Sequence, residues 1–176
     1  MSFQQNLQMG KTAESDIARW LIKRGQSVLP VYEKIIDEGK GPQLFTGGEG
    51  LIAPDMLAIC KGKVLWIEAK HKTGFAFYRK GNKFVTGIDL RHYLDYLRVA
   101  AITELPIYLL FLHDGGVVKD SPPGPSGLYG NYLSVLSQRE DHRSGKWGKS
   151  GMVYWARDID GGPLRLLATL EEMNIK

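Results

Sequence analysis

Three charged residues stand at the ends of an apolar segment that has the composition of a β-hairpin. Asp55 opens the segment, and Glu68 and Lys70 follow directly after the apolar residues 64–67. Apolar runs of this kind form buried strands, where desolvating an unpaired charge costs several kcal/mol. Two carboxylates and an ammonium at such a position are therefore expected to meet one another or a ligand.

The predicted hairpin turns within residues 61–63 and brings the three charged side chains to one face. One two-residue turn would place Asp55 across from Glu68, and the other turn that the sequence allows would place it across from Lys70. Side chains alternate along a strand, so the three groups share a face in both registers.

This arrangement predicts a metal site. Two carboxylates about 5 Å apart repel each other unless a divalent cation lies between them, and hard oxygen ligands select Mg²⁺ or Mn²⁺ over zinc. The side chain of Ala69 points away from Glu68 and Lys70, which makes the Ala69 carbonyl a further candidate ligand. Lys70 would neutralise developing charge or orient a water, with a lowered pKa if it is partly desolvated. The alternative is a solvated strand edge whose ion pair contributes under about 1 kcal/mol.

Composition bounds the class of protein. The 176 residues are about one domain, and 43% hydrophobic and 24% charged residues are typical of a soluble globular chain. Cys60 is the single cysteine, which excludes an internal disulfide and a multi-cysteine zinc site. The chain has no apolar run of membrane-spanning length and no signal pattern at its start, so we expect an intracellular, cytoplasmic protein without a membrane partner. The net charge of +4 is compatible with a polyanionic partner.

The order of expected elements indicates a single α/β (α+β) domain over residues 1–176, with a mixed sheet flanked by helices. A core over about residues 12–113 would be followed by a C-terminal extension over about 114–176. The expected elements are a helix from Thr12 to about residue 24, a strand near 28–32, a mobile glycine-rich connection at 39–50, the hairpin at 55–70, a second hairpin or flap at 71–86, a helix at 89–103, a strand at 107–113, irregular chain at 119–130, a helix near 131–138, and strands at 152–156 and 164–167. The second helix should bury a stripe that consists of Leu90, Tyr93, Leu94, Leu97 and Ala101.

These residues carry a family resemblance. Pro54-Asp55, twelve intervening residues and then Glu68-Ala69-Lys70 resemble the signature of the PD-(D/E)xK nuclease superfamily, and the order of elements over about residues 12–113 is similar to its core. The resemblance implies a restriction-endonuclease-like core and Mg²⁺-dependent hydrolysis of DNA phosphodiester bonds. It leaves open a Holliday-junction-resolvase-like enzyme, a restriction-type endonuclease, and a repair or phage nuclease.

The resemblance also implies roles for residues outside the hairpin. An acid on the first helix commonly completes the metal site in this family, which corresponds to Glu14, with Asp16 as the competing choice. Many members carry Gln-x-x-x-Tyr on the helix after the catalytic strand. This chain has His92 and Tyr96 at that spacing, so it departs at the first residue, and contact of His92 with water or a phosphate is an expectation only.

Basic residues after the catalytic strand are candidates for DNA binding. The predicted DNA contacts are Lys72, Arg79, Lys80, Lys83, His92 and Tyr96. Neighbouring Phe75, Phe77 and Phe84 would stack on bases or simply pack. A second basic stretch at 139–149 would reach along DNA or form a plain surface loop. A resolvase would form a homodimer, with residues 129–136 as a candidate contact strip.

Two other functions remain open from the sequence. One is an inactive nuclease fold that serves as a DNA-binding or assembly module. The other is a metal-dependent enzyme that acts on a small phosphorylated substrate, although basic loops beside the site favour a long polyanion.

Overall fold

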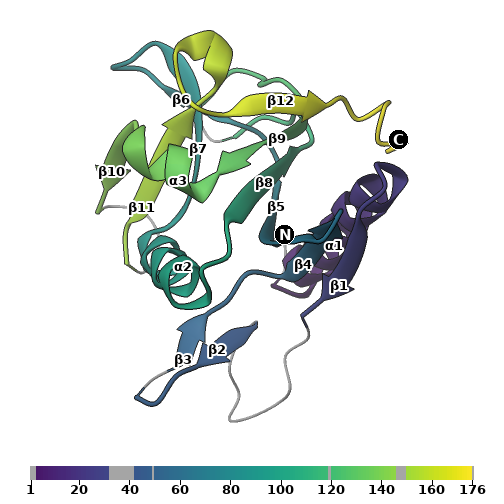
Figure 1. The fold of residues 1–176 in the computed structure, drawn as a ribbon. Helices are drawn as coiled ribbons and strands as arrows, with labels where there is room; N and C mark the ends of the chain where they lie inside the picture. Colours follow the sequence, from purple (N-terminus) through teal and green to yellow (C-terminus); the bar gives the residue numbers. More distant parts are fainter. Residues whose placement is uncertain (1–2, 32–41, 49, 119, 146–149, 176) are drawn as a thin grey trace.

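A six-stranded mixed sheet forms the centre of the computed structural model, which describes residues 3–31, 42–48, 50–118, 120–145 and 150–175 (Figure 1). The strands in order across this sheet are β1 (Ser27–Pro30), β4 (Met56–Cys60), β5 (Lys63–Lys72), β8 (Ile107–His113), β9 (Gly127–Tyr132) and β12 (Arg165–Ala168). β5 and β8 run parallel, and the other neighbours are antiparallel. The predicted α+β class with a mixed sheet and flanking helices is confirmed.

Two smaller sheets and three α-helices surround the central sheet. The four-stranded sheet has the order β10 (His142–Ser144), β11 (Met152–Ala156), β7 (Lys83–Asp89) and β6 (Ala76–Tyr78), and β2 (Gln43–Phe45) pairs with β3 (Gly50–Ile52). The helices are α1 (Phe3–Lys23), α2 (Leu90–Thr103) and α3 (Leu133–Gln138), with a 3₁₀ turn, η1, at Asp158–Asp160. None of the described helices is long and apolar enough to cross a membrane.

The central sheet is covered on both faces, and each face has its own hydrophobic core. On one face α1 packs Ile17 against Ile67 of β5 and Leu110 of β8. α2 and the four-stranded sheet lie on the other face (Figure 1). Their Tyr96 and Trp155 belong to a larger hydrophobic cluster. β5 is therefore buried from both sides, as its continuous apolar sequence predicts.

The buried face of α2 differs from the predicted stripe. Tyr93 is buried as expected, but Leu94 is 45% exposed, and the helix buries Tyr96 and Val99 instead. α2 lies between the central sheet and β3. Its buried face is therefore determined by two neighbours rather than by one. Asp95 is buried with them because it accepts a hydrogen bond from a β3 amide.

The first helix and the glycine-rich connection also differ from expectation. α1 begins at Phe3 rather than at Thr12, which is exposed within the helix. Residues 3–9 contain mostly Gln, Leu and Met with good helix propensity, and the single Gly10 does not interrupt the helix. Within the connection at 39–50 the chain pairs β2 with β3, while residues 39–41 and 49 lie outside the described residues. The predicted second hairpin is present as β6 and β7.

The chain after residue 113 is part of both large sheets. β9 and β12 complete one side of the central sheet, and β11 pairs with β7. β9 lies partly where irregular chain was predicted. The candidate dimer strip at 129–136 is largely core, because Tyr129, Leu133 and Leu136 are buried. That part of the homodimer prediction is wrong.

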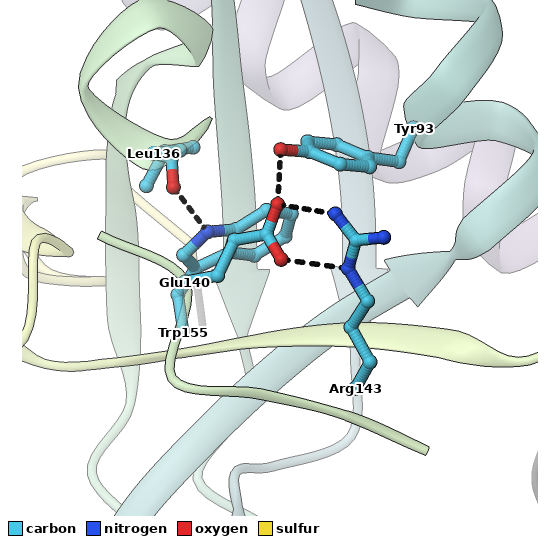
Figure 2. Close-up of polar contacts among 5 residues, drawn as sticks. All are labelled: Tyr93, Leu136, Glu140, Arg143 and Trp155. Atoms are coloured by element: carbon cyan, nitrogen blue, oxygen red, sulfur yellow. Dashed lines mark hydrogen bonds and ion pairs between the residues drawn. The ribbon is translucent and has the colours of Figure 1, made fainter. Parts of the chain in front are cut away.

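A polar network joins α2 to the C-terminal part of the chain (Figure 2). The hydroxyl of Tyr93 donates to Glu140 Oε1 at 2.5 Å, and Arg143 donates to both Glu140 oxygens at 2.7 and 2.8 Å. The indole N–H of Trp155 donates to the carbonyl of Leu136 at 2.9 Å. The hydrogen bonds from Arg143 hold the pKa of Glu140 below its usual value. Charge-assisted contacts therefore tie the four-stranded sheet to α2, and a neutral hydrogen bond ties α3 to β11.

His113 is a buried polar residue of the core whose ring is poorly satisfied by hydrogen bonds. Its ring is fully buried and stacks on Phe75 with ring centroids 3.7 Å apart. Neither ring nitrogen has a hydrogen-bond partner among the described residues. Burial, with the charge of Lys72 beside it, lowers the pKa of His113 from 6.5 to about 3. The ring is therefore neutral in the folded protein at pH 7.

We predict that His113→Phe stabilises the fold and that its advantage grows in acid. The unfolded chain takes up a proton at His113 below pH 6.5, whereas the folded chain does so only near pH 3. The wild type therefore loses stability as pH falls through this window, by about 1.4 kcal/mol per pH unit for this one group. Urea unfolding of both proteins at pH 7.5, 6 and 5 measures the difference, in which the other titrating groups cancel. A difference in unfolding free energy that does not change with pH would contradict the prediction.

Candidate functional site

The register of the β4–β5 hairpin decides how the candidate site is assembled. Cys60 pairs with Lys63 and Met56 pairs with Ile67, so the turn is Lys61-Gly62. Both turn residues have positive φ, 49° and 76°, as a type I′ turn requires. Of the two registers that the sequence allows, this is the one that continues to Asp55 opposite Glu68.

Asp55 is fixed at the end of this ladder by a side-chain hydrogen bond. Its Oδ2 accepts from the backbone N–H of Ala69 at 2.8 Å, two residues beyond Ile67, the last residue of β5 that pairs with β4. Its own carbonyl accepts from the N–H of Val31 at 2.9 Å. The carboxylate therefore replaces a strand partner for Ala69 and is held beside β5.

Glu68 is the most unusual residue of the site. It is 0% exposed, and neither carboxylate oxygen has a hydrogen-bond partner among the described residues apart from an ion-pair contact of Oε1 with the Lys70 ammonium. Ile67 and Ala69 point to the opposite face, into the core under α1, as predicted. A buried carboxylate with so few partners is costly, because little offsets its desolvation.

Lys70 stays charged in this setting. Burial alone would lower the pKa of its ammonium, but the carboxylates of Glu68 and Asp55 outweigh burial and raise that pKa above its usual value. The lowered pKa that partial desolvation predicted for Lys70 is therefore wrong. An ammonium that keeps its proton can orient water or stabilise negative charge, but it is not a general base.

The two carboxylates fit a hard divalent cation. Burial, and then the charge of Glu68, raise the pKa of Asp55 from 3.8 to about 7, because Lys70 offsets only part of the repulsion. The donors beside the Glu68 oxygens are the Lys70 ammonium and the Tyr96 hydroxyl. Among the described residues there is no group of three His, Cys, Asp or Glu side chains arranged as metal ligands. A cation here would need backbone carbonyl, water or substrate oxygens besides the two carboxylates, which is how Mg²⁺ is usually bound.

The two candidate acids on α1 differ in their surroundings. Glu14 is half-buried, and its charge contributes to the raised pKa of Lys70, so it lies near the site. Asp16 pairs instead with Arg19 of its own helix at 2.9 Å. Because no three-carboxylate cluster is formed, Glu14 is not assembled with Asp55 and Glu68 as a direct third ligand. A contribution through water stays a prediction.

α2 adds two rings to the site. The charge of Lys70, after burial, lowers the pKa of His92, so this half-buried imidazole is near Lys70 and neutral at pH 7. Tyr96 is only 1% exposed, and burial with the charges of Glu68 and Asp55 raises the pKa of its hydroxyl well above 10. Direct contact of Tyr96 with DNA is therefore excluded by its burial. The ring faces the acids instead.

Asp95 is a supporting residue that the sequence interpretation missed. Its Oδ2 accepts from the backbone N–H of Ile52 in β3 at 3.2 Å. This bond fastens the β2–β3 hairpin to α2, just before the chain enters Pro54 and Asp55. The available signal was the one acid of the helix, one position before Tyr96, but only tertiary packing shows which side it faces.

The remaining candidates for DNA binding separate by exposure. Arg79 and Lys80 are exposed at the β6–β7 turn, where Arg79 also donates to the carbonyl of Asp120 at 3.4 Å. Lys83 forms an ion pair with Asp141. Lys72 is half-buried, and burial with the charge of Lys70 lowers its pKa to about 8. Arg79 and Lys80 are thus the two candidates freely placed for a phosphate backbone.

The aromatic residues near this turn serve packing. Phe75 is fully buried, and Phe77 contacts Phe84 edge to face with centroids 5.2 Å apart. The second basic stretch is largely occupied, because Arg139 donates to the carbonyl of Gly161 and Arg143 pairs with Glu140. Residues 146–149 of that stretch lie outside the described residues.

Comparison with known proteins gives a distant likeness among solved structures. No family model matches the chain, and no curated protein matches it. Among solved structures it is similar to Hjc of Archaeoglobus fulgidus, a Holliday junction resolvase from an archaeal hyperthermophile, with 12% identity and a TM-score of 0.49 over 82% of this chain and 86% of that one. A likeness at this level does not bear on function, which has to be inferred from the residues of the site.

We predict that Asp55→Asn stabilises the metal-free protein. The amide oxygen keeps an acceptor for the Ala69 N–H, while the charge that repels Glu68 is removed. The folded pKa of Asp55, about 7, is above the unfolded value of 3.8, so the charged group lowers stability increasingly as pH rises through this window. The gain should therefore reach about 4 kcal/mol at pH 8 and be below about 1 kcal/mol at pH 4.

Thermal unfolding in the presence of chelator measures this gain. Asp16→Asn is the matched control, because Asp16 pairs with Arg19 and is not part of the site. Adding Mn²⁺ should raise the melting temperature of the wild type and of Asp16→Asn but not that of Asp55→Asn. A variant that is less stable than the wild type at pH 8 would show that the two acids do not repel each other.

Proposed function

We propose that this chain is a metal-dependent nuclease of the PD-(D/E)xK type that hydrolyses DNA phosphodiester bonds. The observation that carries the proposal is the buried Glu68 carboxylate, which has the Lys70 ammonium, the Asp55 carboxylate and the Tyr96 hydroxyl beside it. A structural ion pair would need no second carboxylate there. Two acids and a permanent ammonium at one strand end are suited to a cation and a phosphate.

In this proposal Asp55, Glu68 and the carbonyl of Ala69 hold Mg²⁺ or Mn²⁺, with Glu14 acting through water. A bound ion of this kind supplies Lewis acidity toward the phosphoryl oxygen and stabilises the leaving oxygen. Lys70 positions the attacking water and offsets the negative charge that develops on the phosphate. Tyr96 restrains the Glu68 carboxylate from the α2 side, and His92 contacts the water or the phosphate as a neutral ring.

DNA is the proposed substrate because a site for a long polyanion needs cations beyond the reacting phosphate. Arg79 and Lys80 provide them at the exposed β6–β7 turn, on the strand pair that follows β5. Lys72 lies on the same face of β5 as Lys70 and is available to a phosphate next to the reacting one.

We predict that Asp55→Asn, Glu68→Gln and Lys70→Ala each lower DNA cleavage by about a hundredfold or more, because each removes a group from the reacting centre. The assay incubates the purified chain with duplex, single-stranded, flap and four-way-junction DNA in Mg²⁺, Mn²⁺ or chelator. Glu14→Gln should lower the rate, and its matched control on the same helix, Asp16→Asn, should not.

DNA binding separates this proposal from its alternatives. Asp55→Asn should still bind DNA in a gel-shift assay, because it removes no cation. Cleavage that persists in chelator would overturn the metal-dependent mechanism. A wild type that binds DNA but cuts none of the four substrates in either metal would instead identify a binding module.

We predict that Arg79→Ala combined with Lys80→Ala weakens DNA binding and makes its salt dependence shallower. Each lost phosphate contact should reduce the slope of log K against log salt by about 0.7–0.9. Lys23→Ala combined with Arg165→Ala removes the same charge from two other exposed positions and is the control. Equal effects of the two double variants would show that net charge, rather than the β6–β7 turn, binds the DNA.

A further inference from the structure

A cavity of about 550 Å³ lies at the turn end of the β4–β5 hairpin, at the other end of β5 from the candidate site. It is bounded by the C-terminal part of α1, by the hairpin turn, and by residues of β5, β8, β9 and β12. About five strand residues separate Lys63 at this end from Glu68, which corresponds to about 17 Å. The volume is that of a site for a small organic ligand.

Aromatic and aliphatic side chains form the walls. Tyr108 and Tyr132 contact each other edge to face with centroids 4.7 Å apart, and Tyr132 is 43% exposed. Trp20 contributes from α1. Such walls favour a flat apolar group, because rings offer both stacking and edge contacts.

The charged residues of the cavity are all basic. Arg24, Lys61 and Lys63 line it, and none of the described lining residues is acidic. The guanidinium of Arg24 lies 4.8 Å from the centroid of the Trp20 ring, which holds its planar donors beside the cavity. Three cations without a counter-charge in the lining select an anionic group, and the fixed guanidinium suits a phosphate.

Gln26 adds a requirement for a hydrogen-bond donor on the ligand. Its side-chain oxygen is buried and has no hydrogen-bond partner among the described residues, although Gln26 lines the cavity. A buried acceptor left unpaired destabilises the protein, so a ligand with an N–H donor would relieve this cost. A fatty acid or inorganic phosphate offers the anion without the flat group and the amine together.

We propose that this cavity binds a nucleotide, with the base against Trp20, Tyr108 and Tyr132, a base N–H donating to Gln26, and the phosphate bound by Arg24, Lys61 and Lys63. The nucleotide is either free or the unpaired end of a DNA strand, since both present the same chemistry. The site contains no residue of the proposed catalytic centre, so it stands or falls separately from the nuclease proposal.

The test is calorimetric titration of the full chain with each ligand, in buffer that contains no divalent ion. dAMP should bind saturably, deoxyadenosine and inorganic phosphate each at least about tenfold more weakly, and dodecanoate no better than phosphate. Lys61→Asn combined with Lys63→Gln should weaken dAMP by about tenfold and leave deoxyadenosine nearly unchanged. Asn is chosen because it tolerates the positive φ of residue 61. Gln26→Leu should weaken dAMP and deoxyadenosine alike.

Three controls make the result decisive. Arg79→Ala combined with Lys80→Ala and, separately, Asp55→Asn should leave dAMP affinity unchanged, which distinguishes this cavity from the DNA strip and from the catalytic centre. A single-stranded oligonucleotide whose affinity falls with the Lys61/Lys63 variant identifies a strand end, and an effect on dAMP alone identifies a free nucleotide. No saturable binding of dAMP at millimolar concentration, or dodecanoate that binds more tightly than dAMP, would overturn the proposal.

Discussion

The hydrogen bond from the Ala69 N–H to the Asp55 carboxylate is the contact on which the candidate site depends. Ala69 lies two residues past Ile67, where the pairing of β4 with β5 ends. The Asp55 side chain therefore accepts the hydrogen bond that a backbone carbonyl of β4 would otherwise accept. This places a second acid beside Glu68 without any further element. A shift of one residue in the hairpin would turn Glu68 and Lys70 toward α1 and leave Asp55 without this partner.

Holding the two acids together lowers the stability of the fold, and packing elsewhere in the molecule offsets this cost. Glu68 is fully buried with one cation beside it, and the pKa of Asp55 is raised to about 7. The surrounding apolar core is extensive, with β5 covered on both faces, and α2 is fixed from one side by Asp95 and from the other by Glu140. A rigid environment allows a few unfavourable groups to persist at the candidate site.

The site hairpin could be predicted from sequence because its geometry is local. Lys61-Gly62 forms a type I′ turn, and once the turn is known, strand alternation fixes the face of Asp55, Glu68 and Lys70. The position of Glu14 of α1 relative to Asp55 and Glu68, and the charge state of Lys70, could not be predicted in this way. Both depend on how far separate elements approach, and the pKa of Lys70 even moves in the opposite direction from that expected of burial alone.

The elements that sequence did not predict share one cause, which is that their neighbours decide them. β9 reads GLYGNY, with two glycines and an asparagine, a composition that disfavours strands. Gly130 nevertheless belongs there, because a β-carbon at this position would lie 2.4 Å from the carbonyl oxygen of Leu109 in β8. The two strands approach closely because of the missing side chain, and only the pairing reveals it.

The same dependence on distant partners explains why the C-terminal part of the chain matters to the site. β11 pairs with β7, and Glu140 binds Tyr93 of α2, so the segment after residue 113 fixes both the β6–β7 turn with Arg79 and Lys80 and the helix that carries His92 and Tyr96 (Figures 1 and 2). The hairpin alone would gather the acids and Lys70 but would neither cover Glu68 nor hold the β6–β7 turn in place. The local sequence of the hairpin determines where the acids lie. Their burial, and with it the strength of the repulsion between them, depends on the whole fold.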